Sequence, residues 1–250
     1  MKILIALSTY NRPIVTELCL QNLQQVRSEF VKLVVYDDAS TAYSKDFLLE
    51  YCDEVVRFER NGGIERSRAK AIRDFVYRYH NFDLIYFTDN DAIHDPKFVD
   101  VIRSVSVWQR TRPEILPLSV YNCRNHSYIK NLIFETDMFF ILKTMPGISQ
   151  CYTRDMAEII VQALNCSAEL ESTYGWDYIY PALLRRHCLI SKVSMVEHFA
   201  RDRYEAGMHT TNSGSGPDAL IDFERSKALN PTPYLFHIRD EIIGKILGPQ

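Results

Sequence analysis

Two aspartates, Asp89 and Asp91, stand on either side of Asn90, directly after a run of strand-forming residues at 82–88. Two unpaired carboxylates this close repel each other, and burial raises the cost of that repulsion. A divalent cation removes it, and the hard ions Mg²⁺ and Mn²⁺ prefer carboxylate oxygens and are often shared with a substrate's phosphates. The triplet therefore indicates a metal site. A solvated turn, or a cap for a helix starting near Asp95, is the plainer alternative.

A second acidic pair, Asp37 and Asp38, lies within another strand-like run at residues 31–40. A carboxylate at a strand end can accept hydrogen bonds from a nucleobase or from ribose hydroxyls, and it can equally close an Asx turn or cap a helix. Gly62 and Gly63 then open a helix whose start favours anions through its free N–H groups and its dipole. Three cationic side chains on this helix add to that attraction: Arg66, Arg68 and Lys70. The plainer alternative is that they form an exposed basic face of the helix.

Two further candidates come from the second half of the chain. Asp177 follows the large aromatic Trp176 just ahead of a helical pattern. Burial beside an apolar wall raises a carboxylate's pKa, which suits a general base, whereas the plainer alternative is a helix cap with a core tryptophan. His198 ends a late strand-like run, and it becomes a metal-ligand candidate only together with Asp89 and Asp91.

Local patterns predict the elements that hold these side chains in place. Strands are expected at residues 2–8, 31–40, 54–58 and 82–88, and helices at 13–27, 62–79 and from 95 onward. This alternation predicts an α/β fold with a mixed, mostly parallel sheet flanked by helices. Ligands of such sheets bind beyond the carboxyl ends of the strands. The polar clusters at 8–11, 37–40 and 89–91 should therefore meet in one crevice.

The second half is less regular. Strands are expected within 115–122, 134–143 and 191–199, and helices within 153–170 and 175–190, the latter with Pro181 near its first turn. Residues 209–219 are rich in glycine and serine and predict a mobile loop. The tail, residues 233–248, has a helical apolar face that packs on the domain, on a second subunit of a homodimer or on a membrane surface.

Composition narrows the class of protein. The chain has 250 residues, a net charge of −3 and 24% charged residues, a profile typical of a globular protein rather than of a strongly basic nucleic-acid binder. Its six cysteines include no CxxC spacing, which fits a reducing compartment and suggests neither zinc nor a redox pair. No apolar run reaches the length of a membrane span. We expect a cytoplasmic protein, with peripheral membrane association open.

In this order the motifs resemble the family 2 glycosyltransferases of the GT-A fold. Those proteins begin with a strand ending in [ST]-x-Y-N, continue with V-D-D-x-S and then with N-x-G and A-R-N on a helix, and then carry an acidic triplet. The corresponding residues here are Ser8-Thr9-Tyr10-Asn11, Asp37-Asp38-Ala39-Ser40, Asn61 to Ala69 and Asp89-Asn90-Asp91. The family's later E-D motif is matched at Asp177, with Trp176 in place of the acidic neighbour, and His198 fits a late metal histidine.

The resemblance implies transfer of a hexose from a nucleotide-diphosphate sugar, by family habit a UDP-sugar, to an acceptor hydroxyl with inversion. It implies Asp177 as the base, and Mn²⁺ or Mg²⁺ held by Asp89, Asp91 and His198. The implied donor-binding residues are Ser8, Tyr10, Asp38, Arg68, Asp89 and Asn90. We expect a catalytic domain at 1–203, with a nucleotide-binding half at 1–110 and an acceptor half at 111–203, followed by a loop and helical tail at 204–250.

The acceptor is left open by the sequence. A glycan or lipid-linked saccharide is the family's common case. The same chemistry on a hydroxylated or glucosylated base of viral DNA is an alternative, for which a basic-aromatic run could meet phosphates: Arg103, Trp108, Arg110, Arg112, Arg124, His126 and Lys130. A non-catalytic sugar-nucleotide-binding protein is the other alternative.

Overall fold

A single nine-stranded sheet organises the part of the chain that the computed structural model describes, residues 1–112, 114–122, 132–167, 170 and 175–198. Its strand order is β3-β2-β1-β4-β9-β6-β10-β8-β7, and a separate small sheet pairs β11 with β5. The elements of the first half are β1 (Ile3–Thr9), α1 (Pro13–Gln24), β2 (Val31–Asp37), α2 (Lys45–Leu49), β3 (Glu54–Arg57), α3 (Ile64–Tyr77), β4 (Leu84–Asp89), β5 (Ala92–His94) and α4 (Phe98–Gln109). Those that follow are β6 (Leu118–Ser119), β7 (Leu132–Glu135), β8 (Phe139–Leu142), β9 (Gln150–Thr153), α6 (Arg154–Cys166), α7 (Trp176–Leu184), β10 (Cys188–Ser191) and β11 (Val196–His198).

The predicted parallel core is confirmed. β3, β2, β1 and β4 run parallel, with Ser8 in register with Tyr36 on one side and with Asp89 on the other. Every residue of β1 is buried, as expected for a central parallel strand with helices over both faces. Pro13 starts α1 at a position where its missing N–H costs nothing. The carboxyl ends of β1, β2 and β4 consequently meet at one edge.

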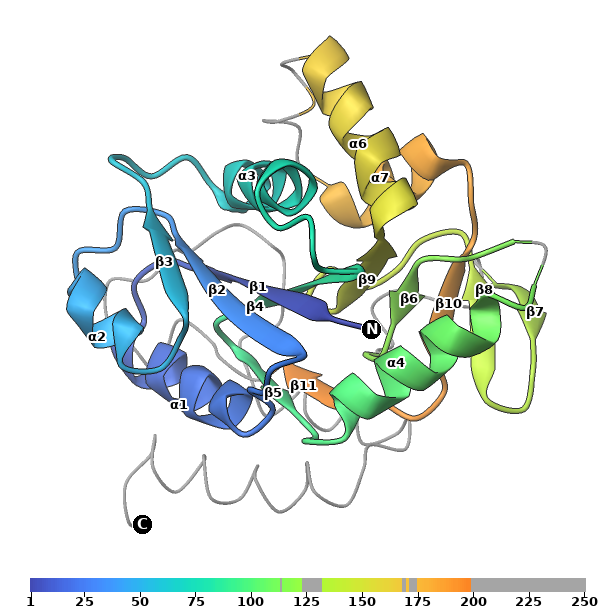
Figure 1. The fold of residues 1–250 in the computed structure, drawn as a ribbon, viewed down its shortest axis with the longest axis horizontal. Coiled ribbons are helices and arrows are strands. Elements are labelled where there is room, and N and C mark those ends of the chain that lie inside the picture. The colour runs from blue at the N-terminus through green and yellow to red at the C-terminus, as the bar shows by residue number, and fades with distance from the viewer. Residues whose placement is uncertain (113, 123–131, 168–169, 171–174, 199–250) are drawn as a thin grey trace.

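Helices cover both faces of the sheet (Figure 1). α1, α2 and α4 pack on one face, where Leu20, Leu48 and Ile102 belong to one buried cluster. α3, α6 and α7 pack on the other, where Phe75 and Ile160 are buried. The mixed, helix-flanked sheet predicted from the sequence is therefore present.

Several boundaries and three strands differ from the sequence predictions. β5, β9 and β10 were not predicted, and the stretch 134–143 contributes to a hairpin of β7 and β8 instead of one strand. β9 enters antiparallel beside β4, so the sheet becomes mixed from this point onward. α4 begins at Phe98 rather than near residue 95, and Pro181 lies inside α7. Each missed strand is short and pairs with residues far away in the chain, so its local pattern is weak.

Two predictions fall on residues that the structure does not describe. The glycine-rich loop at 209–219 and the tail helix at 233–248 both lie outside the described residues. Among the helices that are described, none combines the length and the apolar character needed to cross a membrane.

Candidate functional site

The strand ends converge on one cavity of about 450 Å³. It lies where β1, β2 and β4 finish, which is the expected ligand position in a parallel sheet. Among the candidate site residues, it is lined by Ser8, Tyr10, Asp38, Asp89, Asn90, Asp91 and His198. Two other candidates, Arg68 and Asp177, are not part of this lining. The cavity therefore gathers most of the residues that the sequence singled out.

Asp91 is the most heavily paired carboxylate of the cavity. Its Oδ2 accepts from Arg12 Nη1 at 2.5 Å and lies 3.1 Å from His198 Nε2. Burial alone would raise the pKa of Asp91, but the neighbouring His198 imidazole and Arg12 guanidinium, with their hydrogen bonds, outweigh it and hold the pKa well below its usual range. Asp91 is thus a carboxylate at any physiological pH.

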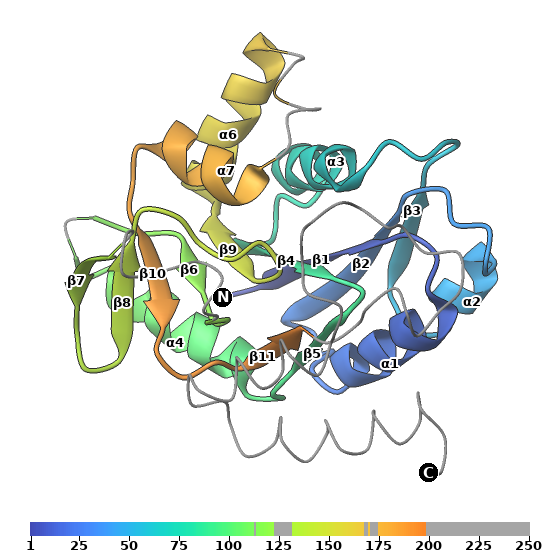
Figure 2. The same ribbon diagram turned by 180° about the vertical axis from the view of Figure 1, so that it is seen from behind.

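His198 reaches Asp91 through the small sheet. β11 pairs antiparallel with β5, and this register sets His198 opposite Ala92, the residue after Asp91. Figure 2 shows this strand pair between α4 and α1. A histidine more than a hundred residues away in the sequence is thereby delivered to the acidic triplet.

Asp89 has a different partner. Its Oδ1 accepts from Arg68 Nη2 at 2.5 Å, and Arg68 is fully buried with its guanidinium 4.8 Å from the centre of the Phe87 ring. Burial raises the pKa of Asp89 and the negative charge of Asp91 adds to it, while Arg68 opposes the rise. The predicted donor-binding residue Arg68 therefore acts, in this structure, beneath the cavity as the counter-ion of Asp89.

The metal hypothesis can be tested against these contacts. No group of three or more histidine, cysteine, aspartate or glutamate side chains is arranged as a metal centre within the described ranges. Asp91 and His198 do converge, and one or two protein ligands suffice for Mg²⁺ and similar hard ions, which keep several waters and bind substrate phosphates. The donor chemistry of this pair fits such an ion. That Asp89 is a third ligand stays a prediction.

Asp38 shapes a loop in the cavity wall. Its two carboxylate oxygens accept from the backbone N–H groups of Gly62 and Gly63, both at 2.8 Å. Burial raises the pKa of Asp38, while these two hydrogen bonds lower it. Gly63 needs to be glycine because its φ is +87° and an added Cβ would lie 3.1 Å from Glu65 Oε2. Asp38 thus joins the end of β2 to the start of α3.

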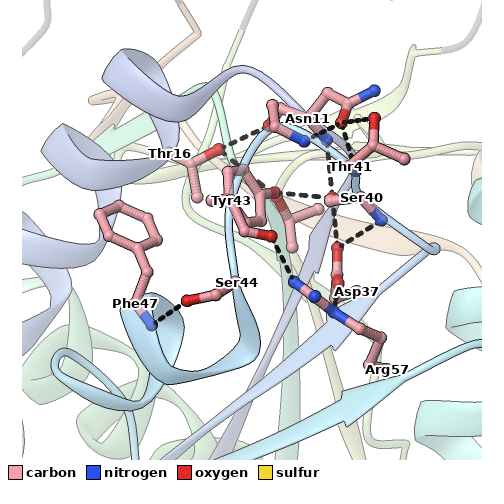
Figure 3. A network of polar contacts seen from close by, with 11 residues as sticks. Asn11, Thr16, Asp37, Ser40, Thr41, Tyr43, Ser44, Phe47 and Arg57 are labelled. Atoms are coloured by element: carbon pink, nitrogen blue, oxygen red, sulfur yellow. Dashed lines mark hydrogen bonds and ion pairs between the residues drawn. The ribbon is translucent and has the colours of Figure 1, made fainter.

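The neighbouring Asp37 has a structural role (Figure 3). It is fully buried, pairs with Arg57 and accepts from Ser40 Oγ. Ser40 Oγ in turn accepts from Asn11 N at 2.8 Å and lies 3.0 Å from Tyr43 Oη. This network ties the turn after β1, where Asn11 lines the cavity, to the turn after β2.

Asn90 also contributes to the framework. Its side-chain nitrogen donates to Thr16 Oγ1 at 2.7 Å and to the carbonyl of Asn11 at 3.3 Å. These bonds hold the acidic triplet against the start of α1. The structure therefore gives the Asn90 side-chain nitrogen a structural use, and its contact with a donor stays a prediction.

Asp177 lies in the first turn of α7, outside the cavity lining. Burial raises the pKa of its half-buried carboxyl, while the N–H groups of Asp177 and Tyr178 lower it. Arg68 and Glu65 act on it electrostatically, which places it on the same side of the sheet as α3. The side chain of Trp176 lies outside the described residues.

Two charged residues of the cavity lining were missed as candidates. Arg12 was noted only as the residue after the first motif, and Glu65 only as part of a basic helix. Burial raises the pKa of Glu65, and its Oε1 has no hydrogen-bond partner within the described part of the chain. The available signal for Arg12 was its position between the polar residues 8–11 and Pro13.

The basic-aromatic run is only partly described. Arg103 lies over the ring of Phe30, Arg112 lies over that of Trp108, and Arg110 pairs with Asp83 at 3.8 Å. Arg124, His126 and Lys130 fall outside the described residues. Intramolecular contacts thus account for the described arginines, and the DNA acceptor stays a prediction.

A family model identifies the chain. Residues 4–153 match the family described as Glycosyl transferase family 2, which is more than half of the chain. The protein therefore belongs to family 2 of the glycosyltransferases, as the motifs predicted. Among curated proteins no sequence matches it.

Solved structures show the same fold. Staphylococcus aureus TarS is 16% identical, with 76% of this chain and 35% of that chain covered and a TM-score of 0.53. TarS 1–349 in complex with UDP-GlcNAc is 16% identical, with 76% and 56% covered and a TM-score of 0.50. The mannosyltransferase PcManGT from Pyrobaculum calidifontis, in complex with GDP-Man and Mn²⁺, is 17% identical, with 64% and 46% covered and a TM-score of 0.47.

At these identities the likeness to TarS establishes the GT-A fold. The match extends over 35% of TarS and 46% of PcManGT, so this chain corresponds to about a third to a half of those proteins.

Proposed function

We propose that the protein transfers a sugar from a nucleotide-diphosphate sugar, with a UDP-sugar as the simplest donor, to an acceptor hydroxyl in a metal-dependent reaction. The observation that carries this proposal is the cavity that gathers Asp38, Asp91 and His198 at the strand ends. Its volume of about 450 Å³ lies within the usual range of small-molecule sites. Membership of family 2 and the UDP-GlcNAc complex of TarS support the choice of donor.

In this proposal the nucleoside lies beside β1 and β2. Asp38 uses one lone pair of each oxygen on Gly62 and Gly63, and a carboxylate has about four acceptor positions in all. Acceptor positions therefore remain for an N–H group of the base or a ribose hydroxyl. Ser8 and Tyr10 line the same cavity and can contribute further hydrogen bonds.

The diphosphate would lie near Asp91 and His198. A divalent cation held there, with Asp89 as the predicted third ligand, would offset the charge that develops on the leaving diphosphate. When no cation is bound, Arg68 balances the negative charge of the buried Asp89. The acidic triplet can then remain buried at the end of β4 without unfolding the turn.

We assign the general base to Asp177. Burial raises the pKa of its carboxyl, which improves its ability to take a proton from an acceptor hydroxyl. Attack by that hydroxyl from the face opposite the leaving group would invert the anomeric centre. The proposed acceptor is a glycan or a lipid-linked saccharide.

The experiment is a panel of nucleotide sugars incubated with the protein, with and without Mn²⁺, scored by donor hydrolysis and by binding. We expect one donor to be turned over only with Mn²⁺, and Asp91→Asn to lower this turnover at least a hundredfold. Asp46→Asn, on the exposed face of α2, is the matched control and should leave turnover unchanged. Binding of a donor without turnover in the presence of every acceptor tested would instead favour a sugar-nucleotide-binding protein.

Asp177→Asn separates the base from the donor site. We expect donor affinity to stay within about threefold and transfer to fall by about 10²–10⁴-fold, the usual contribution of a general base. Equal loss of donor affinity and transfer would remove Asp177 from the role of base. Proton NMR of the first product formed would give the anomeric outcome.

A further inference from the structure

The turn after β1 has an uncommon backbone. Asn11 and Arg12 both have positive φ, at 52° and 64°, and Arg12 directly precedes Pro13. Residues other than glycine seldom adopt this conformation, and a following proline restricts the backbone further. Such conformations persist where the surrounding structure enforces them, and they are concentrated at functional sites.

The surrounding contacts that enforce this turn are visible in part in Figure 3. The Asn11 side-chain oxygen accepts from Thr41 N at 2.9 Å and Ala42 N at 3.1 Å, while Asn11 N donates to Ser40 Oγ. On the other side, Thr16 N donates to the carbonyl of Arg12 at 2.8 Å. The turn is therefore fastened to β2 and to α1, and the side chain of Arg12 is directed into the cavity wall.

There the guanidinium occupies a definite place. Arg12 Nη1 lies 2.5 Å from Asp91 Oδ2, the same oxygen that lies 3.1 Å from His198 Nε2. A divalent cation held between Asp91 and His198 would bind this same oxygen. It would therefore compete with the guanidinium of Arg12 for Asp91 Oδ2. Two cations at one carboxylate oxygen repel each other strongly in a buried site.

We propose that Arg12 is an exchangeable counter-ion. It neutralises Asp91 in the donor-free cavity, and it moves from Asp91 to the diphosphate when nucleotide and divalent cation enter together. A guanidinium is suited to both partners because its planar N–H groups match carboxylate and phosphate oxygens equally well. The inference rests on the proposed function, since it needs a diphosphate in this cavity.

Opposite effects on two ligands follow from this role. Removing Arg12 frees Asp91, so a divalent cation alone should bind more tightly. The same change removes a cation from the diphosphate, so a nucleotide diphosphate should bind more weakly in the presence of that cation. A residue that merely supports the turn would weaken both ligands together.

The test compares the unaltered protein with Arg12→Gln. Mn²⁺ affinity without nucleotide is measured from the electron paramagnetic resonance signal of free Mn²⁺, and UDP affinity at saturating Mn²⁺ by calorimetry. We expect Mn²⁺ to bind about tenfold more tightly and UDP about tenfold more weakly in Arg12→Gln. Arg73→Gln, which removes the same charge from a side chain bonded to Asn165, should change neither constant by more than about twofold.

The outcomes separate the two proposals. If the unaltered protein binds neither UDP nor Mn²⁺, the proposed function fails and the counter-ion role fails with it. If it binds both, but Arg12→Gln leaves Mn²⁺ affinity unchanged or lowers it, only the counter-ion role is overturned. A thermal unfolding curve for each variant detects misfolding. If Arg12→Lys is folded and retains UDP affinity, the positive charge at this position is what binds the diphosphate.

Discussion

Asp89 and Asp91 are the same residue type two positions apart, yet their pKa values shift in opposite directions. Burial dominates at Asp89, where Arg68 is its hydrogen-bonded cation, whereas His198 and Arg12 together overcome burial at Asp91. Groups whose pKa values are driven apart in this way commonly take different roles in one site. Of the two carboxyl groups, that of Asp91 is therefore the one held more firmly in its charged form.

His94 is a buried titratable group outside that pair. Its Nε2 lies 3.1 Å from Tyr86 Oη and 3.3 Å from Thr88 Oγ1, and burial lowers its pKa to about 3. Below pH ~6.5 the unfolded chain takes up a proton at His94 that the folded protein does not. The free energy of unfolding should therefore fall as pH decreases, by about 1.4 kcal/mol per pH unit, between pH ~6.5 and pH ~3.

Urea unfolding at pH 7 and pH 5 measures this contribution. Relative to the unaltered protein, His94→Gln should lose about 2 kcal/mol less stability over that interval, because its side chain cannot take up the proton. His80→Gln, at an exposed position, is the control and should follow the unaltered protein. Equal pH dependence in all three proteins would show that His94 titrates alike in the folded and unfolded states.

At the scale of elements, α1 fastens the short strand β5. The Asn22 side chain donates to the carbonyl of His94 at 2.9 Å and accepts from His94 N at 2.8 Å, so it hydrogen-bonds β5 as a neighbouring strand would. β5 in turn pairs with β11, which carries His198. The position of His198 in the site therefore depends on this side chain of α1.

We expect Asn22→Ala to lower the free energy of unfolding by about 2–4 kcal/mol, because it leaves a buried N–H and a buried carbonyl without partners. Gln21→Ala removes a side chain from the exposed face of the same helix and should change it by less than about 0.5 kcal/mol. Chemical unfolding of both variants makes the comparison. Alanine is a better helix former than asparagine or glutamine, so helix propensity opposes a loss in either variant. Similar losses in the two variants would mean that the contact of Asn22 with β5 does not determine the effect.

At the scale of the whole molecule, Arg154 joins the two halves of the chain. It lies at the start of α6, where its guanidinium donates to the carbonyls of Phe75 at 3.2 Å, Tyr79 at 2.7 Å and Phe82 at 2.6 Å. These carbonyls lie at or just after the end of α3, where the helix leaves acceptors without intrahelical donors. Arg154 thus links α6 to the end of α3, in addition to the pairing of β9 with β4.

Replacing Arg154 with lysine keeps the charge but cannot supply the same planar set of donors. We expect one cooperative unfolding transition, shifted by about 2–3 kcal/mol, because the two halves share a sheet. Arg110→Lys, at an exposed pair, is the control and should shift it by less than about 0.5 kcal/mol. Two separate transitions in Arg154→Lys, followed by fluorescence and circular dichroism, would contradict the single unit.

Local sequence patterns were sufficient to predict the parallel strands that carry the site. The buried runs of β1, β2 and β4 predicted strands because apolar side chains repeat within a few residues, and Pro13 marked the start of α1. The acidic residues that follow β2 and β4 were assigned to one edge, because parallel strands end together. Family 2 membership followed from the same motifs.

Contacts between distant parts of the chain were decided only by the tertiary structure. The family resemblance had already grouped His198 with Asp91, but only the tertiary structure showed that β11 and β5 bring the two together. It also directed Arg12 onto the same carboxylate and inserted β9 beside β4. Strand pairing and ion pairing across many residues leave no periodic pattern in the sequence, because either partner alone has many equally good alternatives. The sequence by itself therefore determined the strand ends and their acidic side chains, whereas the long-range packing determined which cations meet them.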